Sequence, residues 1–167
     1  MIRRFSFFLC FLLAGCSGSA LSSLKEVPQA PDFHLKTLSG QPFRLADLKG
    51  QVVLLDFWAT WCDACTGSIP VFEKFYHRHK RGGFKVVGVN VDAVAKPVLE
   101  FVSRYRMSYP VILDPQNMVM EKYRVRALPN LFLIDRKGLV RHHWVGFDVS
   151  LETVLEDKIQ KLLKEKA

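Results

Sequence analysis

The chain has 167 residues, of which 49% are hydrophobic and 12% aromatic, and its formal net charge is +8. This length suits one domain with a sizeable core, and the composition excludes a disordered chain. The basic residues are scattered, and no motif combines them with aromatic residues as in nucleic-acid-binding proteins, so we expect no nucleic-acid partner. We attribute the charge to a solvated surface with a mild attraction to anionic lipid.

The N-terminus has the pattern of a secretion signal. Arg3 and Arg4 precede an apolar run over residues 5–13 that is too short to span a bilayer. The run ends in Leu-Ala-Gly followed by Cys16, which resembles the lipobox of bacterial lipoproteins. That resemblance implies a signal over 1–15, a lipid on Cys16, and a location in the bacterial cell envelope, anchored to a membrane and facing the periplasm or the exterior. The alternative is an ordinary secretory signal followed by a chance cysteine.

Residues 16–30 are small and polar, as in a flexible tether, and we expect one folded domain over 31–167. Of the four cysteines, Cys10 lies in the signal and Cys16 would carry the lipid. Cys62 and Cys65 then remain as the only thiols. A secreted domain with a single C-x-x-C has no structural disulfide framework, so this pair is either redox-active or metal-binding.

The hydrophobic pattern predicts alternating strands and helices. Residues 33–35 and 42–45 alternate around a turn, as in a small hairpin, and the apolar run 51–58 predicts a strand buried on both faces. The elements expected after this strand are a helix over 62–80, a strand over 84–91, a helix over 96–105, a strand over 110–113, a helical turn over 117–123, strands over 130–135 and 139–145, and a helix over 150–164.

Details within these elements follow from residue type. Pro70 is expected to kink the first helix, because proline removes an intrahelical hydrogen bond. Ser150 is expected to cap the last helix, and helical spacing places Leu99 and Val154 on buried faces. The order of elements predicts an α/β fold with a mixed central β-sheet, helices on both faces and an N-terminal β-hairpin extension. We expect a monomer.

The C-x-x-C lies at the turn between the buried strand and the first helix. This position puts Cys62 at a helix N-terminus, where unpaired N–H groups and the helix dipole stabilise a thiolate. A stabilised thiolate is what thiol–disulfide exchange requires.

The run Asp56-Phe57-Trp58-Ala59-Thr60-Trp61-Cys62-Asp63-Ala64-Cys65 resembles the active site of thioredoxin. Its flanks narrow the resemblance to the TlpA/ResA-type thiol–disulfide oxidoreductases. These flanks are residues 30–33, 45–50, Pro70, and 123–138 with Pro129. The resemblance covers residue 30 to the end and implies a thioredoxin-like fold, protein-disulfide oxidoreductase activity and no cofactor.

The resemblance assigns roles to particular residues. Cys62 is the expected nucleophile and Cys65 the resolving thiol. Asp56 would lie buried beneath the cysteines, where its raised pKa suits it to take the proton of Cys65; the alternative is a strand-end Asp that faces water. Pro129 matches a cis-proline, and the backbone of Leu128 would pair with an extended client segment. The alternative is a trans proline that starts a strand.

Trp61 packs beside the disulfide in this family. Other positions depart from the family pattern. Asp63-Ala64 replaces the common x-Pro between the cysteines, and the charge of Asp63 is expected to disfavour the Cys62 thiolate and so favour reduction of other proteins. Ser68 stands where many relatives carry Glu, Asn130 where Thr is usual and Ala127 where Gly is frequent.

The leading hypothesis is an extracytoplasmic, membrane-tethered reductant of cysteine pairs in exported proteins, including the C-x-x-C-H haem sites of apocytochromes c. Because that compartment is oxidising, a membrane thiol carrier of the DsbD/CcdA type would supply the electrons. A disulfide-forming oxidase of the same fold is the nearest alternative.

A Cu(I) chaperone and a thiol peroxidase are further alternatives. Two thiolates can bind Cu(I), but no Met or His lies beside the pair. Residues 31–33 are shared with peroxidases, whose Pro-x-x-x-Thr-x-x-Cys pattern is absent. Four histidines are interpreted as solvated surface residues: His77, His79, His142 and His143. We therefore expect no metal site.

Overall fold

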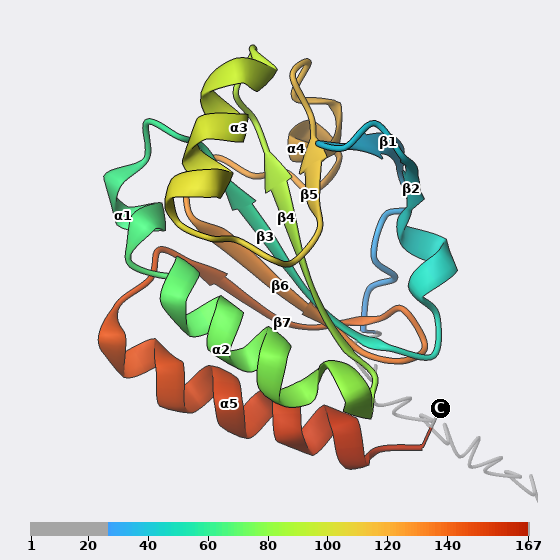
Figure 1. Ribbon diagram of the computed structural model, residues 1–167. Coiled ribbons are helices and arrows are strands. Elements are labelled where there is room, and N and C mark those ends of the chain that lie inside the picture. Colours follow the sequence, from blue (N-terminus) through green and yellow to red (C-terminus); the bar gives the residue numbers. More distant parts are fainter. Residues whose placement is uncertain (1–26, 167) are drawn as a thin grey trace, which may run out of the picture.

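The computed structural model describes residues 27–166 (Figure 1). The predicted signal, Cys10 and Cys16 lie outside this range. The strands are β1 (His34–Thr37), β2 (Pro42–Arg44), β3 (Val52–Trp58), β4 (Phe84–Asn90), β5 (Val111–Leu113), β6 (Asn130–Ile134) and β7 (Val140–Val145). The α-helices are α1 (Asp63–Thr66), α2 (Ile69–His79), α3 (Ala95–Arg104), α4 (Met118–Lys122) and α5 (Val149–Lys164).

The strands form one seven-stranded mixed sheet in the order β2-β1-β5-β4-β3-β6-β7. β3, β4 and β5 run parallel, and the other pairings are antiparallel. β3 lies in the interior of the sheet and all of its residues are buried, as its apolar run predicts. The predicted N-terminal hairpin is confirmed, and it extends the sheet because β1 pairs with β5.

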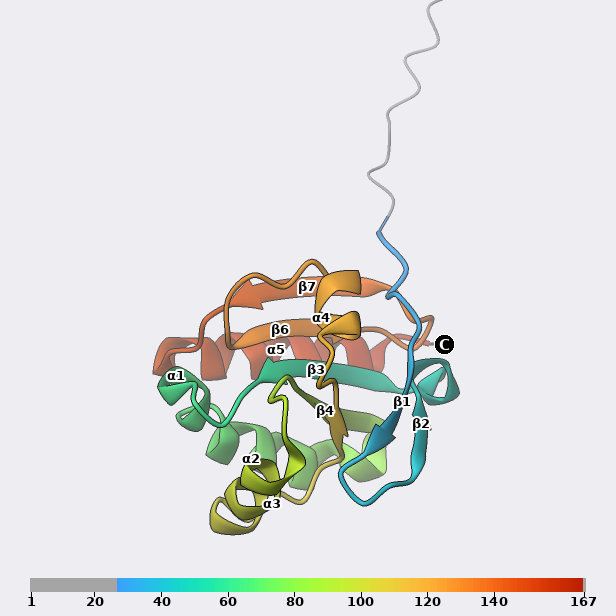
Figure 2. The ribbon, with the colours of Figure 1, turned by 90° about the horizontal axis from the view of Figure 1, so that it is seen from above.

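Helices cover both faces of the sheet. Along β3, successive side chains alternate between the faces: Trp58 packs on Phe101 of α3 with ring centroids 5.0 Å apart, whereas Phe57 packs on Tyr123, which follows α4, at 5.3 Å. Figure 2 shows α4 across the sheet from α2 and α3. The predicted fold class is therefore confirmed, and Asp56 lies on the same face as Trp58.

The predicted helix over 62–80 is two helices, α1 and α2, separated at Gly67 and Ser68. Pro70 lies in the first turn of α2. At that position the missing N–H of proline needs no intrahelical partner. The prediction of one helix kinked at Pro70 is therefore wrong, since Pro70 begins the second helix instead of bending a continuous one.

Three further predictions in the helices are wrong. The side chains of Leu99 and Val154 are exposed instead of buried. The buried face of α3 and that of α5 each contain fewer residues than the helical spacing of apolar residues predicts. The cap of α5 is Asp148 and not the predicted Ser150. The carboxylate of Asp148 accepts a 2.7 Å hydrogen bond from the amide of Ser150. Asp148 precedes the first helical residue, Val149, and therefore occupies the cap position.

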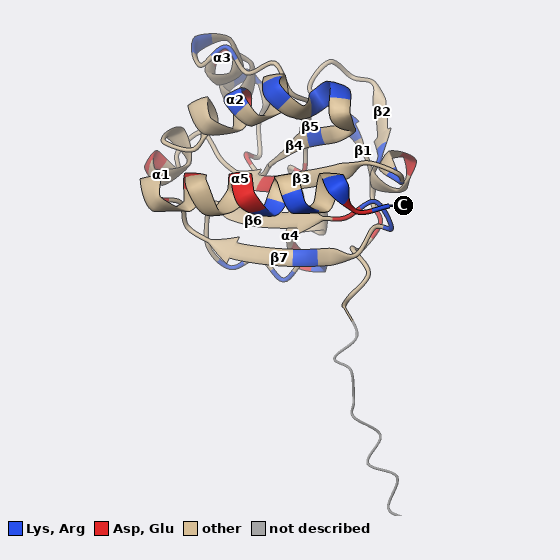
Figure 3. Cartoon of the chain, turned by 90° about the horizontal axis from the view of Figure 1, so that it is seen from below, with Lys and Arg blue, Asp and Glu red and all other residues tan. Residues whose placement is uncertain are grey.

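The folded region begins by Pro28, slightly before the boundary expected at residue 31. The amide of Val140 donates to the carbonyl of Pro28, and the amide of Ala30 donates to the carbonyl of Gly138, both at 2.9 Å. Lys and Arg residues are spread over α2, α3, α5 and β7 (Figure 3). Within residues 27–166, none of the helices combines the length and apolar character that crossing a bilayer requires.

Candidate active site

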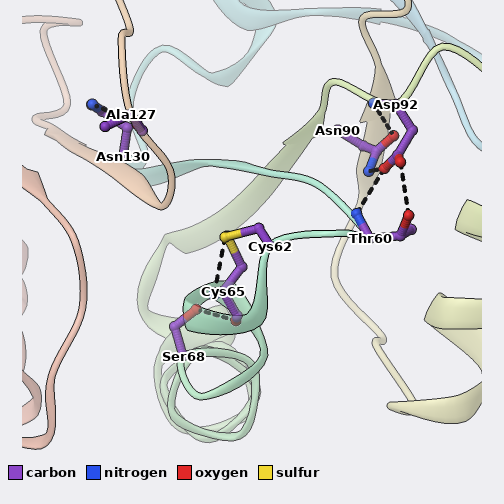
Figure 4. The surroundings of a disulfide bond; sticks show 8 residues. All are labelled: Thr60, Cys62, Cys65, Ser68, Asn90, Asp92, Ala127 and Asn130. Carbon is purple, nitrogen blue, oxygen red and sulfur yellow. Dashed lines mark hydrogen bonds between the residues drawn. A yellow bond between two sulfur atoms is a disulfide. The ribbon is translucent and has the colours of Figure 1, made fainter.

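Cys62 and Cys65 form a disulfide at the end of the loop that leaves the carboxyl end of β3 (Figure 4). Their Cα atoms are 5.4 Å apart. Cys62 is 8% exposed and Cys65 is 1% exposed. Cys62 is thus the more exposed of the two cysteines, in the order that the assignment of nucleophile and resolving thiol requires.

A local hydrogen bond serves the sulfur of Cys62. Cys62 is the N-cap of α1, and its Sγ accepts a 3.2 Å hydrogen bond from the amide of Cys65. Because α1 ends at Thr66, its own dipole is that of a single turn. The amide of Cys65 is therefore the group positioned to stabilise a thiolate on Cys62, instead of the long helix that the sequence predicts.

Ser68 lies directly behind the pair and is fully buried. Its hydroxyl donates a 2.8 Å hydrogen bond to the carbonyl of Cys65 and does not cap α2. A small hydroxyl therefore occupies the position where the resemblance leads one to expect a carboxylate.

The loop before Cys62 is held by a network that the sequence analysis missed. The carboxylate of Asp92 accepts hydrogen bonds from the amide of Thr60 at 2.8 Å and from its hydroxyl at 2.7 Å. The side chain of buried Asn90 donates to the same carboxylate at 2.7 Å (Figure 4). The sequence does contain a signal for this network, because Asn90 and Asp92 are polar residues at and just after the end of β4. The carboxyl ends of neighbouring parallel strands meet at one edge of a sheet, so these residues are expected near the loop that follows β3.

Asp56 is 1% exposed, which excludes the alternative that it faces water. Burial raises the pKa of Asp56 to about 8, because the ionised form is penalised in the interior. Its Oδ1 atom has no hydrogen-bond partner within the described residues. A proton acceptor with a pKa near the working pH is well suited to general base chemistry.

The peptide bond between Leu128 and Pro129 is cis, as the resemblance implies. The segment that contains it lies beside the disulfide loop (Figure 4). Asn130, which follows Pro129, is buried, and its side chain donates to the carbonyl of Ala127 at 3.3 Å and is bonded to His143 Nε2 at 2.7 Å. These two contacts fix the turn around Pro129 to β7.

Trp61 immediately precedes Cys62 and is 68% exposed. Trp61 is thus a large apolar side chain on the surface, next to Cys62 in the sequence. Trp58, by contrast, belongs to the core.

His79 departs from the prediction of a solvated surface residue. His143 is exposed, as predicted, but it also bonds Asn130 and stacks on Phe132 with centroids 4.4 Å apart. His79 is bonded to Glu156 at 2.9 Å in a partly buried contact between α2 and α5. Their hydrogen-bonding capacity is used within the fold, which spacing along the sequence does not reveal.

Comparison with known proteins places the chain in a family. Residues 28–143 match the model of the AhpC/TSA family. The chain is 38% identical over 117 residues to the thiol-disulfide oxidoreductase ResA of Geobacillus kaustophilus, covering 70% of this chain and 67% of that protein. It is 34% identical over 134 residues to ResA of Bacillus cereus, covering 80% and 76%.

Solved structures agree with this placement. A Chlorobium tepidum protein that carries the name thiol:disulfide interchange protein DsbE superposes with a TM-score of 0.80 at 38% identity, covering 84% of this chain and 99% of that one. The Mycobacterium tuberculosis protein DsbF gives a TM-score of 0.73 at 28% identity, covering 82% and 99%. The chain belongs to the AhpC/TSA family and is a thiol–disulfide oxidoreductase of the ResA/DsbE type, with Cys62 and Cys65 as its disulfide pair.

Proposed function

We propose that this oxidoreductase reduces disulfides of exported proteins at the outer side of a bacterial membrane. The signal pattern over 1–15 supports export, and the lipobox resemblance supports a lipid anchor on Cys16, with a tether before the folded region. The single observation that carries the proposal is the disulfide between Cys62 and the more deeply buried Cys65, next to the exposed residue Trp61.

The reaction begins with the reduced enzyme. The thiolate of Cys62 attacks one sulfur of a client disulfide, and the other client sulfur leaves as a thiolate that takes a proton from water. Cys65 then gives its proton to Asp56 and attacks the Cys62 sulfur of the mixed disulfide. The second client sulfur leaves, so two electrons pass to the client and the Cys62–Cys65 disulfide forms.

The segment at Leu128 and Pro129 and the indole of Trp61 are proposed to hold the client. An extended client backbone would pair with the main chain of Leu128, and its apolar side chains would pack on Trp61. Clients are exported proteins with cysteine pairs, among which apocytochromes c, with their C-x-x-C-H sites, form one class. A membrane thiol carrier of the DsbD/CcdA type is proposed to reduce the enzyme again, because the compartment is oxidising.

The charge beside Cys62 supports the proposed direction of electron flow. Asp63 is exposed and directly follows Cys62, so its carboxylate disfavours a thiolate on that sulfur. A less stabilised reduced form makes a better reductant. The Asp63→Ala variant is therefore expected to have a more oxidising potential than the natural chain, and the opposite order would contradict this account.

The decisive experiment is to trap clients with the Cys65→Ser variant in cells. This variant should accumulate mixed disulfides at Cys62 with exported proteins, and Cys62→Ser in the same background should accumulate none. A potential near about −270 mV or below supports a reductant, whereas one near about −180 mV or above favours the disulfide-forming oxidase. Loss of membrane attachment in Cys16→Ser, with exchange activity retained, tests the anchor separately.

A further inference from the structure

Five buried side-chain polar atoms in residues 27–166 have no hydrogen-bond partner, and three of them belong to β3 and to the segment before β5. These three are Oδ1 of Asp56, Nε1 of Trp58 and the hydroxyl of Tyr109. Asp56 and Trp58 project from the same face of β3, because they are two residues apart in a strand. Tyr109 reaches this face from the segment that precedes β5.

Gly88 brings the three groups together. It is the register partner of Asp56 on the adjacent parallel strand β4. A Cβ atom at Gly88 would lie 2.8 Å from Nε1 of Trp58 and 3.3 Å from Cε2 of Tyr109. Both rings therefore extend over the backbone directly beside Asp56, in space that any larger residue would occupy.

Tyr109 also has an outward side. It lines a groove of about 430 Å³ together with Tyr76 and Leu99. Its neighbour Ser108 donates its hydroxyl to Glu73 of α2 at 2.7 Å. Burial, and then the negative charges of Asp56 and Glu73, raise the pKa of the Tyr109 hydroxyl well above its usual range. The hydroxyl therefore keeps its proton and is available as a hydrogen-bond donor.

Within residues 27–166, burial is the cause that raises the pKa of Asp56, and no charge that would stabilise its carboxylate offsets this effect. Its strand neighbours are Gly88 on β4 and Leu131 on β6. Phe101 of α3 packs on Trp58. Glu73 of α2 is itself acidic, and burial is the cause that raises the pKa of Asp56. α5 contributes the buried apolar residues Leu155, Ile159 and Leu162.

We propose that Tyr109 is a positioning residue for Asp56: its hydroxyl donates a hydrogen bond to a water molecule, which in turn donates one to the Asp56 carboxylate. This inference rests on the proposed role of Asp56 as the base for Cys65. A buried carboxylate without donors is strongly disfavoured, and a donor to the charged form lowers the pKa of the acid. The proton of Cys65 moves to Asp56, whereas the phenolic proton stays on Tyr109 throughout.

The test is the Tyr109→Phe variant, which keeps the ring and removes the donor. Two quantities are measured in the full chain: the pKa of Asp56 by ¹³C NMR, and the pH profile of the step in which Cys65 resolves a preformed mixed disulfide on Cys62. Both midpoints are expected to rise by about one pH unit, which makes resolution about tenfold slower at pH 7. The Tyr105→Phe variant, which removes a hydroxyl from the end of α3, is the matched control and should leave both midpoints unchanged.

The outcomes separate this inference from the proposed function. An unchanged pKa of Asp56 in Tyr109→Phe overturns the inference, even if Asp56→Asn abolishes the pH dependence of resolution. If Asp56→Asn leaves the pH profile intact, both the base role and the inference that rests on it fail. In the Asp56→Asn background, Tyr109→Phe is expected to have no further effect on the profile, and an undiminished shift there would overturn the inference.

Discussion

Thr60 and Asp92 lie 32 residues apart in the sequence and are joined by two hydrogen bonds, from the amide and the hydroxyl of Thr60 to the Asp92 carboxylate. This contact fixes the residue two positions before Cys62 to the end of β4. Because Asn90 also donates to Asp92, the carboxylate accepts from a loop and a strand at once. The loop that presents Cys62 is thus held in place from a neighbouring strand, independently of α1.

Replacement of Asp92 with Ala is expected to loosen this loop. The amide of Thr60 and the side chain of Asn90 would lose their acceptor, and the free energy of unfolding should fall by about 1–3 kcal/mol. Thr60→Val removes only the hydroxyl bond and should cost less than Asp92→Ala. Urea unfolding of the oxidised protein measures both, and equal stability of Asp92→Ala and the natural chain would refute the argument.

Asp56 is expected to make the folded protein less stable as the pH rises. An unfolded Asp loses its proton near pH 3.8, whereas folded Asp56 keeps it up to about pH 8. Between these values the folded state binds one more proton than the unfolded state, so its stability falls with rising pH. The slope from this group is about 1.4 kcal/mol per pH unit. Unfolding of Asp56→Asn, measured from pH 4 to 8, should show a flatter dependence; a slope equal to that of the natural chain would mean that Asp56 ionises freely in the fold.

Gly88 is expected to tolerate no side chain. A Cβ at this position would lie 2.8 Å from Nε1 of buried Trp58, so that ring or the strand must shift. Gly88→Ala should therefore lower the free energy of unfolding by about 1–3 kcal/mol. Gly82→Ala is the matched control, because a Cβ at Gly82 meets no atom within 4 Å. If both variants have the same stability in urea, the contact between Gly88 and Trp58 is looser than the structure shows.

The sequence predicts those features that depend on local pattern. The apolar run of β3 identifies a strand buried on both faces, and the C-x-x-C after it locates the active site. The roles of Asp92 and Tyr109 are not predictable in this way, because hydrophobic periodicity does not say which polar residues of distant segments will meet. The boundary between α1 and α2 is also not predictable from local pattern, because proline is compatible either with a kink inside a helix or with the first turn of a new one. In the structure Pro70 lies in the first turn of α2, and the hydroxyl of Ser68, just before it, is bonded to Cys65.

Ser68 provides the last test, because the resemblance described above leads one to expect Glu at this position. Ser68→Ala removes the hydrogen bond from its hydroxyl to the carbonyl of Cys65, but that carbonyl still accepts from the amide of residue 68 at 3.2 Å. The loss of stability should therefore be small, about 1 kcal/mol. Ser68→Glu places a carboxyl at a fully buried position, and ionising it there should cost about 4 kcal/mol at neutral pH.

The two variants are best compared by urea unfolding at pH 5 and pH 8. Ser68→Glu should lose stability, relative to Ser68→Ala, as the pH rises, since the unfolded state releases the proton of the new carboxyl first. Equal stability of the two variants at pH 8 would show that a carboxylate is accommodated behind the pair. Ser68 and Glu would then be interchangeable at this position, and the packing around Cys65 would not exclude Glu.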